Sequence, residues 1–171
     1  TITVNSGSIC AGQIFTLNPT GANTYIFSNG SHTVNPISTS SYSVSGISVQ
    51  GCESSNTVVA TVSVNSLPVI SVNSGSICAG QTFTINPSGA ASYTYSNGSN
   101  TVNPLPGITH YSITGTDLFG CESLSSISTV TTYALPIIAV NSGSTCAGQT
   151  FTINPSGAVT YTYSNGSNTV N

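Results

Sequence analysis

The chain has 171 residues, no Lys or Arg, only three Asp or Glu residues and a formal net charge of −3. Nucleic-acid binding and attraction to anionic lipid both depend on Lys or Arg side chains, so this composition excludes both kinds of partner. It also excludes a catalytic lysine, an arginine clamp on a phosphate and a Lys–Asn isopeptide crosslink. No apolar run approaches the roughly 20 residues of a membrane helix, which predicts no direct membrane insertion.

One pattern occurs three times: VNSGSICAGQIFTLNPTGA from Val4, VNSGSICAGQTFTINPSGA from Val72 and VNSGSTCAGQTFTINPSGA from Val140. The period is 68 residues, longer than the 20–50 residues usual for solenoid repeats, which favours a small domain per repeat. We therefore expect domains at residues 1–68 and 69–136. Residues 137–171 match the first half of a third, incomplete domain. Since the chain begins inside a repeat, we do not expect Thr1 to start the gene product.

The predicted elements are all strands. Residues 56–64 (NTVVATVSV) alternate, with Val58, Ala60, Val62 and Val64 on one face. Residues 67–72 (LPVISV) open the second domain, and residues 81–86 (QTFTIN) place Phe83 and Ile85 on one face. Residues 111–115 (YSITG) form a further strand.

An Asn-Gly pair recurs in every repeat and is typical of a β-hairpin turn. In the second domain the residues SYTYSNGSNTVNP read as a hairpin in which Thr101-Val102 returns against the strand before the turn. The three predicted turns are Asn29-Gly30, Asn97-Gly98 and Asn165-Gly166. Each Asn also begins an NGS glycosylation sequon, which is the alternative interpretation.

Six or seven short strands per unit predict an all-β fold: tandem Ig-like antiparallel β-sandwich domains of about 68 residues each. So small a domain has a limited core and usually needs extra stabilisation. The cysteines recur with the repeats, which predicts disulfides Cys10–Cys52 and Cys78–Cys121, each worth roughly 4 kcal/mol. Cys146 would remain unpaired, its partner lying beyond residue 171. Disulfides indicate an oxidising, extracellular compartment.

The segments SICAGQTFTINPSGA, YTYSNGS, YSITGTDLFGCES and TVV resemble the Ig-like tandem repeats of large secreted and cell-surface proteins of Bacteroidota. The resemblance covers the whole chain. It implies export by the type IX secretion route and a role as an adhesin stalk, a gliding-motility surface filament or a spacer in a secreted enzyme. The first domain departs from the pattern, because YSVSGISVQGC lacks the acid found at Asp117.

Several reactive groupings are alternatives to a structural role. Cys and Gln in CAGQ have the spacing of a thioester, but the repeated second cysteine favours a disulfide. His32 and His110 fall at different repeat positions, so we expect surface residues rather than ligands. The acids Glu53, Asp117 and Glu122 are too few to predict a general acid–base pair or a calcium site, so we expect no catalytic residues, metal or cofactor. Tyr25, Tyr93 and Tyr161 recur at one position, which favours a core role over stacking on sugars.

The sequence thus predicts a non-catalytic segment of an extracellular filament or adhesin stalk at the cell surface. Its partners would be further repeats of the same protein, with self-association into fibres. The alternative is a carbohydrate- or surface-binding module with a glycan or surface ligand. Two explanations of the half domain at 137–171 stay open: further sequence completes it, or another chain donates the missing strands.

Overall fold

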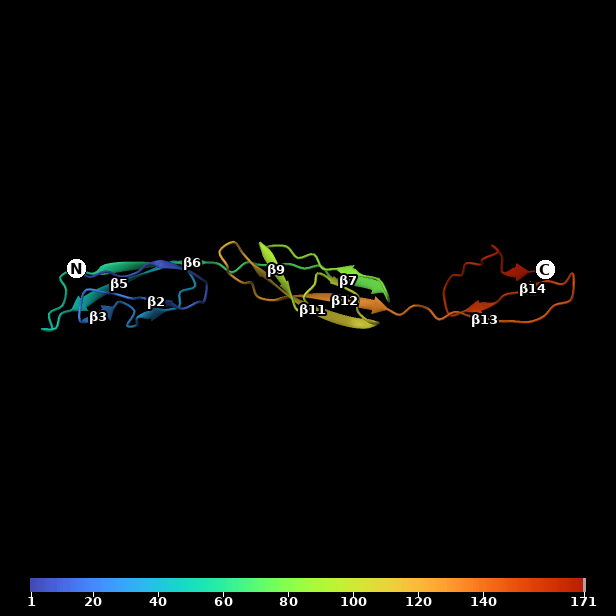
Figure 1. The fold of residues 1–171 in the computed structure, drawn as a ribbon, viewed down its shortest axis with the longest axis horizontal. Coiled ribbons are helices and arrows are strands. Elements are labelled where there is room, and N and C mark those ends of the chain that lie inside the picture. The colour runs from blue at the N-terminus through green and yellow to red at the C-terminus, as the bar shows by residue number, and fades with distance from the viewer. Residues whose placement is uncertain (171) are drawn as a thin grey trace. The chain divides into compact units, whose positions relative to one another are not determined.

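The computed structural model describes residues 1–170, which contain strands β1 to β16 and no helix (Figure 1). None of these residues therefore forms a helix long and apolar enough to cross a membrane. The predicted all-β class is confirmed. Sheets and turns are described below repeat by repeat.

Six strands form each complete repeat. In the first they are β1 (Gly7–Cys10), β2 (Phe15–Thr16), β3 (Thr24–Phe27), β4 (Thr33–Val34), β5 (Ser40–Ile47) and β6 (Val58–Asn65). One sheet has the order β1-β6-β5-β3, and β2 pairs with β4 in a second sheet. The second repeat has β7 (Gly75–Cys78), β8 (Phe83–Thr84), β9 (Ser92–Tyr95), β10 (Thr101–Val102), β11 (Gly107–Thr116) and β12 (Ser126–Tyr133). Its sheets are β7-β12-β11-β9 and β10-β8, the same arrangement.

The core lies between the two sheets of a repeat. In the first repeat Leu17, which follows β2, and Val34 of β4 pack with Ala60 and Val62 of β6. Val59, between the inward positions of β6, is 59% exposed, as the predicted alternation requires. The second repeat buries the equivalent residues Ile85, Val102, Ser128 and Val130, and it also buries Ile113, the counterpart of the buried Val44. The predicted Ig-like sandwich is thus confirmed by strand order and by the packing of its core.

Not every strand pair is antiparallel. β1 runs parallel to β6, with Gly7 opposite Val62 and Cys10 opposite Asn65. β7 runs parallel to β12 in the same register, so that Cys78 lies opposite Tyr133. The first strand of a repeat therefore ends where its last strand ends, which determines where the cysteines lie.

The predicted hairpins do not form, although their turns do. Gly30, Gly98 and Gly166 have φ of 75–76°, and in the second repeat the Gly98 N–H donates to the Tyr95 carbonyl at 2.9 Å. However, β9 pairs with β11, whereas β10 pairs with β8. In the first two repeats the Asn-Gly turn thus carries the chain from one sheet to the other, because alternate burial is satisfied by packing the flanking strands across the core rather than side by side.

The recurring residues of the VNSGS pattern have local structural roles. The Asn73 side chain donates to the Thr84 carbonyl at 3.0 Å and accepts from the Asn86 N–H at 2.6 Å. Asn5 and Asn141 make the equivalent bonds. A Cβ added to Gly75 would lie 2.7 Å from Phe83 Cε2, so the phenylalanine ring of the FT strand packs directly on this glycine. These contacts explain why this part of the pattern recurs three times.

The third repeat forms β13 (Ala139–Val140), β14 (Phe151–Thr152), β15 (Pro155–Ser156) and β16 (Thr169–Val170), joined as β13-β15 and β14-β16. Residues 143–146 and 160–163, equivalent to β1 and β3, form no strands. In the first repeat these strands pair with β6 and β5, which have no counterparts in the third repeat of this sequence. Several apolar side chains there are exposed: Ile137, Ile138, Val140 and Val159.

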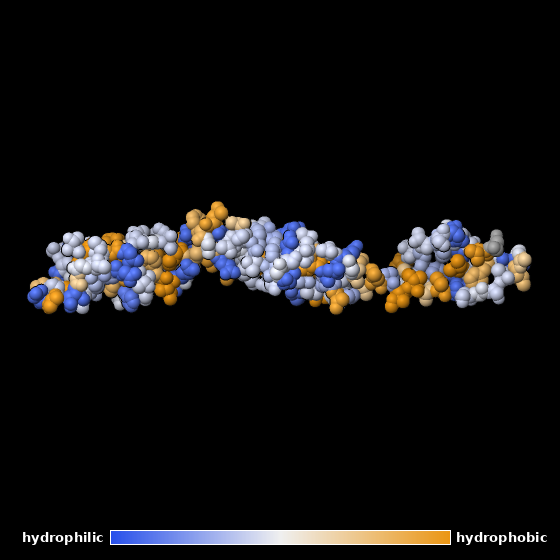
Figure 2. All heavy atoms as spheres, in the orientation of Figure 1, coloured by the Kyte–Doolittle hydropathy of each residue, from blue (hydrophilic) through white to orange (hydrophobic). Residues whose placement is uncertain are grey.

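The chain forms two compact units whose segments interleave in the sequence. The first comprises Thr1–Ser74, Thr84–Val102 and His110–Thr129, and the second comprises Gly75–Phe83, Asn103–Thr109 and Val130–Asn171. Because these units do not follow the repeat limits, the domains 1–68, 69–136 and 137–171 stay a prediction. The surface is mostly pale in Figure 2, as expected for a chain rich in uncharged polar residues, with scattered orange apolar patches.

Candidate functional site: a disulfide between successive repeats

A tight turn follows the first strand of both complete repeats and presents a cysteine at the end of the sheet, and the third repeat has the same turn at residues 146–149. We call residues 10–13, 78–81 and 146–149 the CAGQ turns. In the first, the Gln13 N–H donates to the Cys10 carbonyl at 3.0 Å, and the Cys10 N–H donates to Gln13 Oε1 at 3.2 Å. Gly12 has φ of 81°, which favours glycine. The Ala11 N–H donates to the Asn65 carbonyl at 2.9 Å and so ties the turn to the end of β6.

A second cysteine lies in the connection between the last two strands. We call residues 48–52 and 117–121 the cysteine loops. Asp117 Oδ1 accepts the N–H groups of Phe119 and Cys121, both at 2.8 Å, and the Asp117 N–H donates to the Cys121 carbonyl at 3.0 Å. A short acceptor side chain that bonds the backbone just ahead of it is a common way to stabilise a turn. Asp117 therefore shapes the loop that holds Cys121.

Ser48 takes the place of Asp117 in the first repeat. Ser48 Oγ accepts the Cys52 N–H at 3.2 Å, and the Ser48 N–H donates to the Cys52 carbonyl at 2.9 Å. The glycine before each cysteine has φ of 81° in both loops. The two loops therefore have the same backbone form, and the missing acid of the first repeat is replaced by a weaker acceptor.

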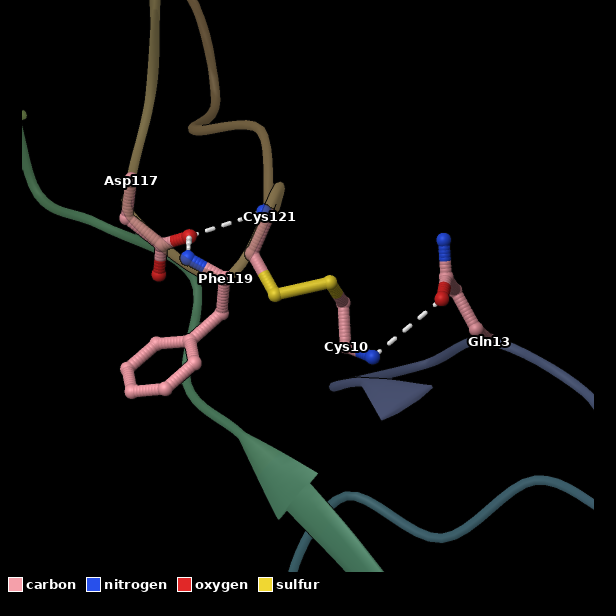
Figure 3. Close-up of a disulfide and its surroundings, with 5 residues drawn as sticks. All are labelled: Cys10, Gln13, Asp117, Phe119 and Cys121. Carbon is pink, nitrogen blue, oxygen red and sulfur yellow. Dashed lines mark hydrogen bonds between the residues drawn. A yellow bond between two sulfur atoms is a disulfide. The ribbon is translucent and has the colours of Figure 1, made fainter. Parts of the chain in front are cut away.

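The structure joins a CAGQ turn to a cysteine loop of the next repeat (Figure 3). Cys10 and Cys121 form a disulfide with a Cα–Cα distance of 5.5 Å, across a sequence separation of 111 residues. Cys10 is 8% exposed and Cys121 is 1% exposed, so the bond is shielded from solvent. Figure 3 shows Gln13 and Asp117 holding the backbone on either side of the bond.

The predicted bonds Cys10–Cys52 and Cys78–Cys121 are wrong in pairing, because the two cysteines of a repeat lie at opposite ends of its sheet. Cys10 lies opposite Asn65, the last residue of β6, whereas Cys52 precedes Val58, the first. The eight residues of β6 correspond to about 23 Å at the usual rise. Disulfide-bonded Cα atoms are at most about 6.8 Å apart. Cys10 can therefore bond only to a cysteine near its own end of the sheet.

Three cysteines remain as free thiols, and all are exposed: Cys52, Cys78 and Cys146. Cys78 and Cys146 occupy the same repeat position as the bonded Cys10, and Cys52 occupies the position of the bonded Cys121. Equivalent cysteines are thus buried where they are bonded and exposed where they are not.

The structure does not bring the other candidate residues together. Cys10 Sγ is used in the disulfide, so this cysteine forms no thioester with Gln13. Within residues 1–170, no three His, Cys, Asp or Glu side chains are placed to hold a metal ion. His32 and His110 are exposed, and His110 Nδ1 lies 3.0 Å from Thr129 Oγ1. The sequon residues Asn29, Asn97 and Asn165 are exposed.

The recurring tyrosine is held by its own turn. The Tyr93 hydroxyl accepts from the Ala90 N–H at 2.9 Å and donates to the Ala90 carbonyl at 3.0 Å. Tyr25 and Tyr161 make the same pair of bonds with Ala22 and Ala158. All three side chains are half-buried. This position therefore supports a structural role for the ring and its hydroxyl.

No known protein family matches the sequence, and no curated protein does. Among solved structures, the chain is similar to the fibronectin(III)-like modules of Clostridium thermocellum CbhA, with a TM-score of 0.36 and 10% identity over 78% of this chain and 95% of that one. It is also similar to a titin fragment, with a TM-score of 0.29 and 13% identity over 77% and 95% of the two chains. A third match is a Bacteroides ovatus glucan-utilisation protein solved with a mixed-linkage heptasaccharide, with a TM-score of 0.20 and 19% identity over 84% of this chain and 48% of that one.

Proposed function

We propose that the chain is a non-catalytic structural segment of an extracellular array, a filament or an adhesin stalk, in which successive Ig-like repeats are crosslinked. The observation that carries the proposal is the Cys10–Cys121 disulfide, which joins the first repeat to the second. A bond within one repeat would stabilise only that domain, whereas a bond between repeats makes the array itself continuous. Such a bond persists in an oxidising compartment, which supports an extracellular location.

The similarity of the repeats in their internal contacts also supports a structural role. The bonds of Asn5, Asn73 and Asn141 and the tyrosine bonds recur from repeat to repeat. Within residues 1–170, no repeat has three His, Cys, Asp or Glu side chains placed to hold a metal ion. The resemblance to Bacteroidota surface repeats, with their type IX export, is compatible with this role. The exposed surface has almost no charge, which favours self-association into fibres because electrostatic repulsion is small.

The proposal can be tested by stretching single molecules of the chain held at its two ends. Residues between Cys10 and Cys121 lie inside the covalent loop and are shielded from tension while the bond is intact. Fully extended, that loop would span about 370 Å. We expect the reduced chain to extend by about this much more than the oxidised chain. Equal extension in the two states would mean that the bond bears no load, and the structural proposal would fail.

The carbohydrate-binding alternative has a separate test. The oxidised chain would be applied to a glycan array, with a Tyr25→Ala/Tyr93→Ala/Tyr161→Ala variant as control. We expect no binding by either protein, since the tyrosine hydroxyls are already bonded to backbone. Binding that the triple variant loses would favour a sugar-binding module over a stalk.

A further inference from the structure

We propose that the free thiols of Cys78 and Cys52 are crosslinking sites for neighbouring repeats. Cys78 would bond to the loop cysteine of the repeat that follows, and Cys52 to the turn cysteine of the repeat that precedes. The partner in both cases is another repeat of this same type. The array would then be a ladder of disulfides, each joining a CAGQ turn to the next repeat's cysteine loop. This inference deepens the proposed function and depends on the array continuing beyond two repeats.

The first step in the argument is that the Cys78 turn already has the form of the bonded Cys10 turn. The Cys78 N–H donates to Gln81 Oε1 at 3.0 Å, and the Gln81 N–H donates to the Cys78 carbonyl at 3.0 Å. The Ala79 N–H donates to the Tyr133 carbonyl at 2.8 Å, as Ala11 does to the end of β6. Gly80 has φ of 85°, close to that of the glycine in the first turn. The turn is therefore formed before any bond is made.

The second step is that the Cys52 loop has the form of the bonded Cys121 loop. Ser48 holds the Cys52 backbone by the bonds described above, in the same places where Asp117 holds Cys121. Cys52 is nevertheless exposed, whereas Cys121 is 1% exposed. The sulfur of Cys121 is covered by the turn cysteine of the preceding repeat, whereas this sequence contains no repeat before the one that holds the Cys52 loop.

The third step is that neither thiol has a suitable partner within its own repeat. Sheet length separates the turn cysteine of the first repeat from its loop cysteine, as shown for Cys10 and Cys52. No cysteine of the loop type follows Cys121 in these 171 residues. Exposure of Cys78 and Cys52 is thus what the ladder predicts for positions whose neighbours are not in this chain.

The bond forms by thiol–disulfide exchange with an oxidant that is itself a disulfide, either a small molecule or a protein. The thiolate of one cysteine attacks an oxidant sulfur, forms a mixed disulfide and releases one oxidant thiolate. The thiolate of the second cysteine then attacks the sulfur of the first and releases the other. The two cysteines are oxidised by two electrons, the oxidant is reduced to two thiols, and those thiols take up the two protons.

The test extends the full chain so that the third repeat is complete. Because residues 164–171 repeat the sequence of residues 96–103, a copy of residues 104–136 can follow residue 171 directly. The copy supplies a sixth cysteine, equivalent to Cys121. In the copy, the leucine equivalent to the exposed Leu124 is changed to valine, so that the chymotryptic peptides that contain the two loop cysteines differ in mass. Oxidation with oxidised glutathione is followed by alkylation, chymotrypsin digestion and mass spectrometry.

We expect two disulfides, Cys10–Cys121 and Cys78 to the new cysteine, with Cys52 and Cys146 alkylated. In the Cys78→Ser form the new cysteine should become alkylated, whereas the Cys146→Ser form should keep both disulfides. A new cysteine that stays free, or that bonds to Cys146 in its own repeat, would overturn the proposal. Failure of the stalk function in the stretching or glycan experiments would leave these mapped bonds unchanged, so the two proposals can fail separately.

Discussion

Removing the disulfide between repeats should destabilise the protein far more than removing two of the free thiols. The perturbation is the double variant Cys10→Ser/Cys121→Ser, which deletes the bond without leaving either cysteine to form a new one. The matched control is Cys52→Ser/Cys78→Ser, which changes two exposed thiols at the equivalent repeat positions.

The expected loss in the free energy of unfolding follows from the length of the loop that the disulfide closes. For a sequence separation of 111 residues, the chain-entropy model gives about 5 kcal/mol. Single domains are usually stable by about 5–15 kcal/mol, so this bond is a large share of the total. The corresponding fall in Tm is about 10–20 °C for a chain of this size. The control should change the free energy of unfolding by less than about 0.5 kcal/mol.

Urea unfolding can be followed by tyrosine fluorescence, because the chain has eight Tyr residues and no Trp. Both variants and the parent protein would be measured under oxidising and reducing conditions. Reduction should lower the stability of the parent and of the control, and leave the Cys10→Ser/Cys121→Ser form unchanged. Equal losses in the two double variants would refute the reasoning, because that result requires bonds within each repeat.

Three further substitutions test the packing. Thr132→Val should stabilise the second repeat by about 1 kcal/mol in thermal unfolding, because the Thr132 hydroxyl is buried without a hydrogen bond. The equivalent position of the first repeat is already Val64, so Val64→Thr should have the opposite effect; a neutral Thr132→Val would contradict this account. Tyr93→Phe should cost about 1–2 kcal/mol by loss of its two turn bonds, whereas Tyr95→Phe should cost less than half as much in the same urea assay. Gly75→Ala should cost about 1–3 kcal/mol in that assay, since the new methyl meets the phenylalanine ring that packs there, and an unchanged midpoint would exclude the contact.

The fold class could be predicted from the sequence because the apolar alternation is strong and local. The inward face of β6 is an example, since Ala60 and Val62 are fully buried and Val59 is exposed. The Asn-Gly turns were also predicted, because their positive φ requires glycine whatever the strands do. What the turn residues do not determine is the partner of each flanking strand. The pairing of each strand depends on packing across the core, and for this reason β9 and β10 lie in different sheets.

The prediction of the disulfide pairing was wrong for a related reason. Sequence spacing alone makes the cysteine of the same repeat the nearest partner, but the parallel pairing of β1 with β6 places it at the far end of the sheet. The sequence did contain a signal for a disulfide between repeats. One cysteine is the last residue of the first strand and the other precedes the last strand, so parallel alignment of those strands separates the two. The role of Asp117 was missed because the first repeat has Ser48 at that position.

The distance between the bonded cysteines along the chain has a consequence for the order of folding. In the unfolded chain the shorter loop from Cys10 to Cys52 closes more readily than the loop of 111 residues to Cys121. The native bond is therefore the kinetically disfavoured one, and oxidation before folding should trap chains with a bond that the sheet cannot accommodate. Once β6 has formed, its length separates Cys10 from Cys52 and leaves only Cys121 within reach. Folding must thus precede oxidation, and a chain oxidised too early must wait for disulfide exchange, which takes seconds to hours.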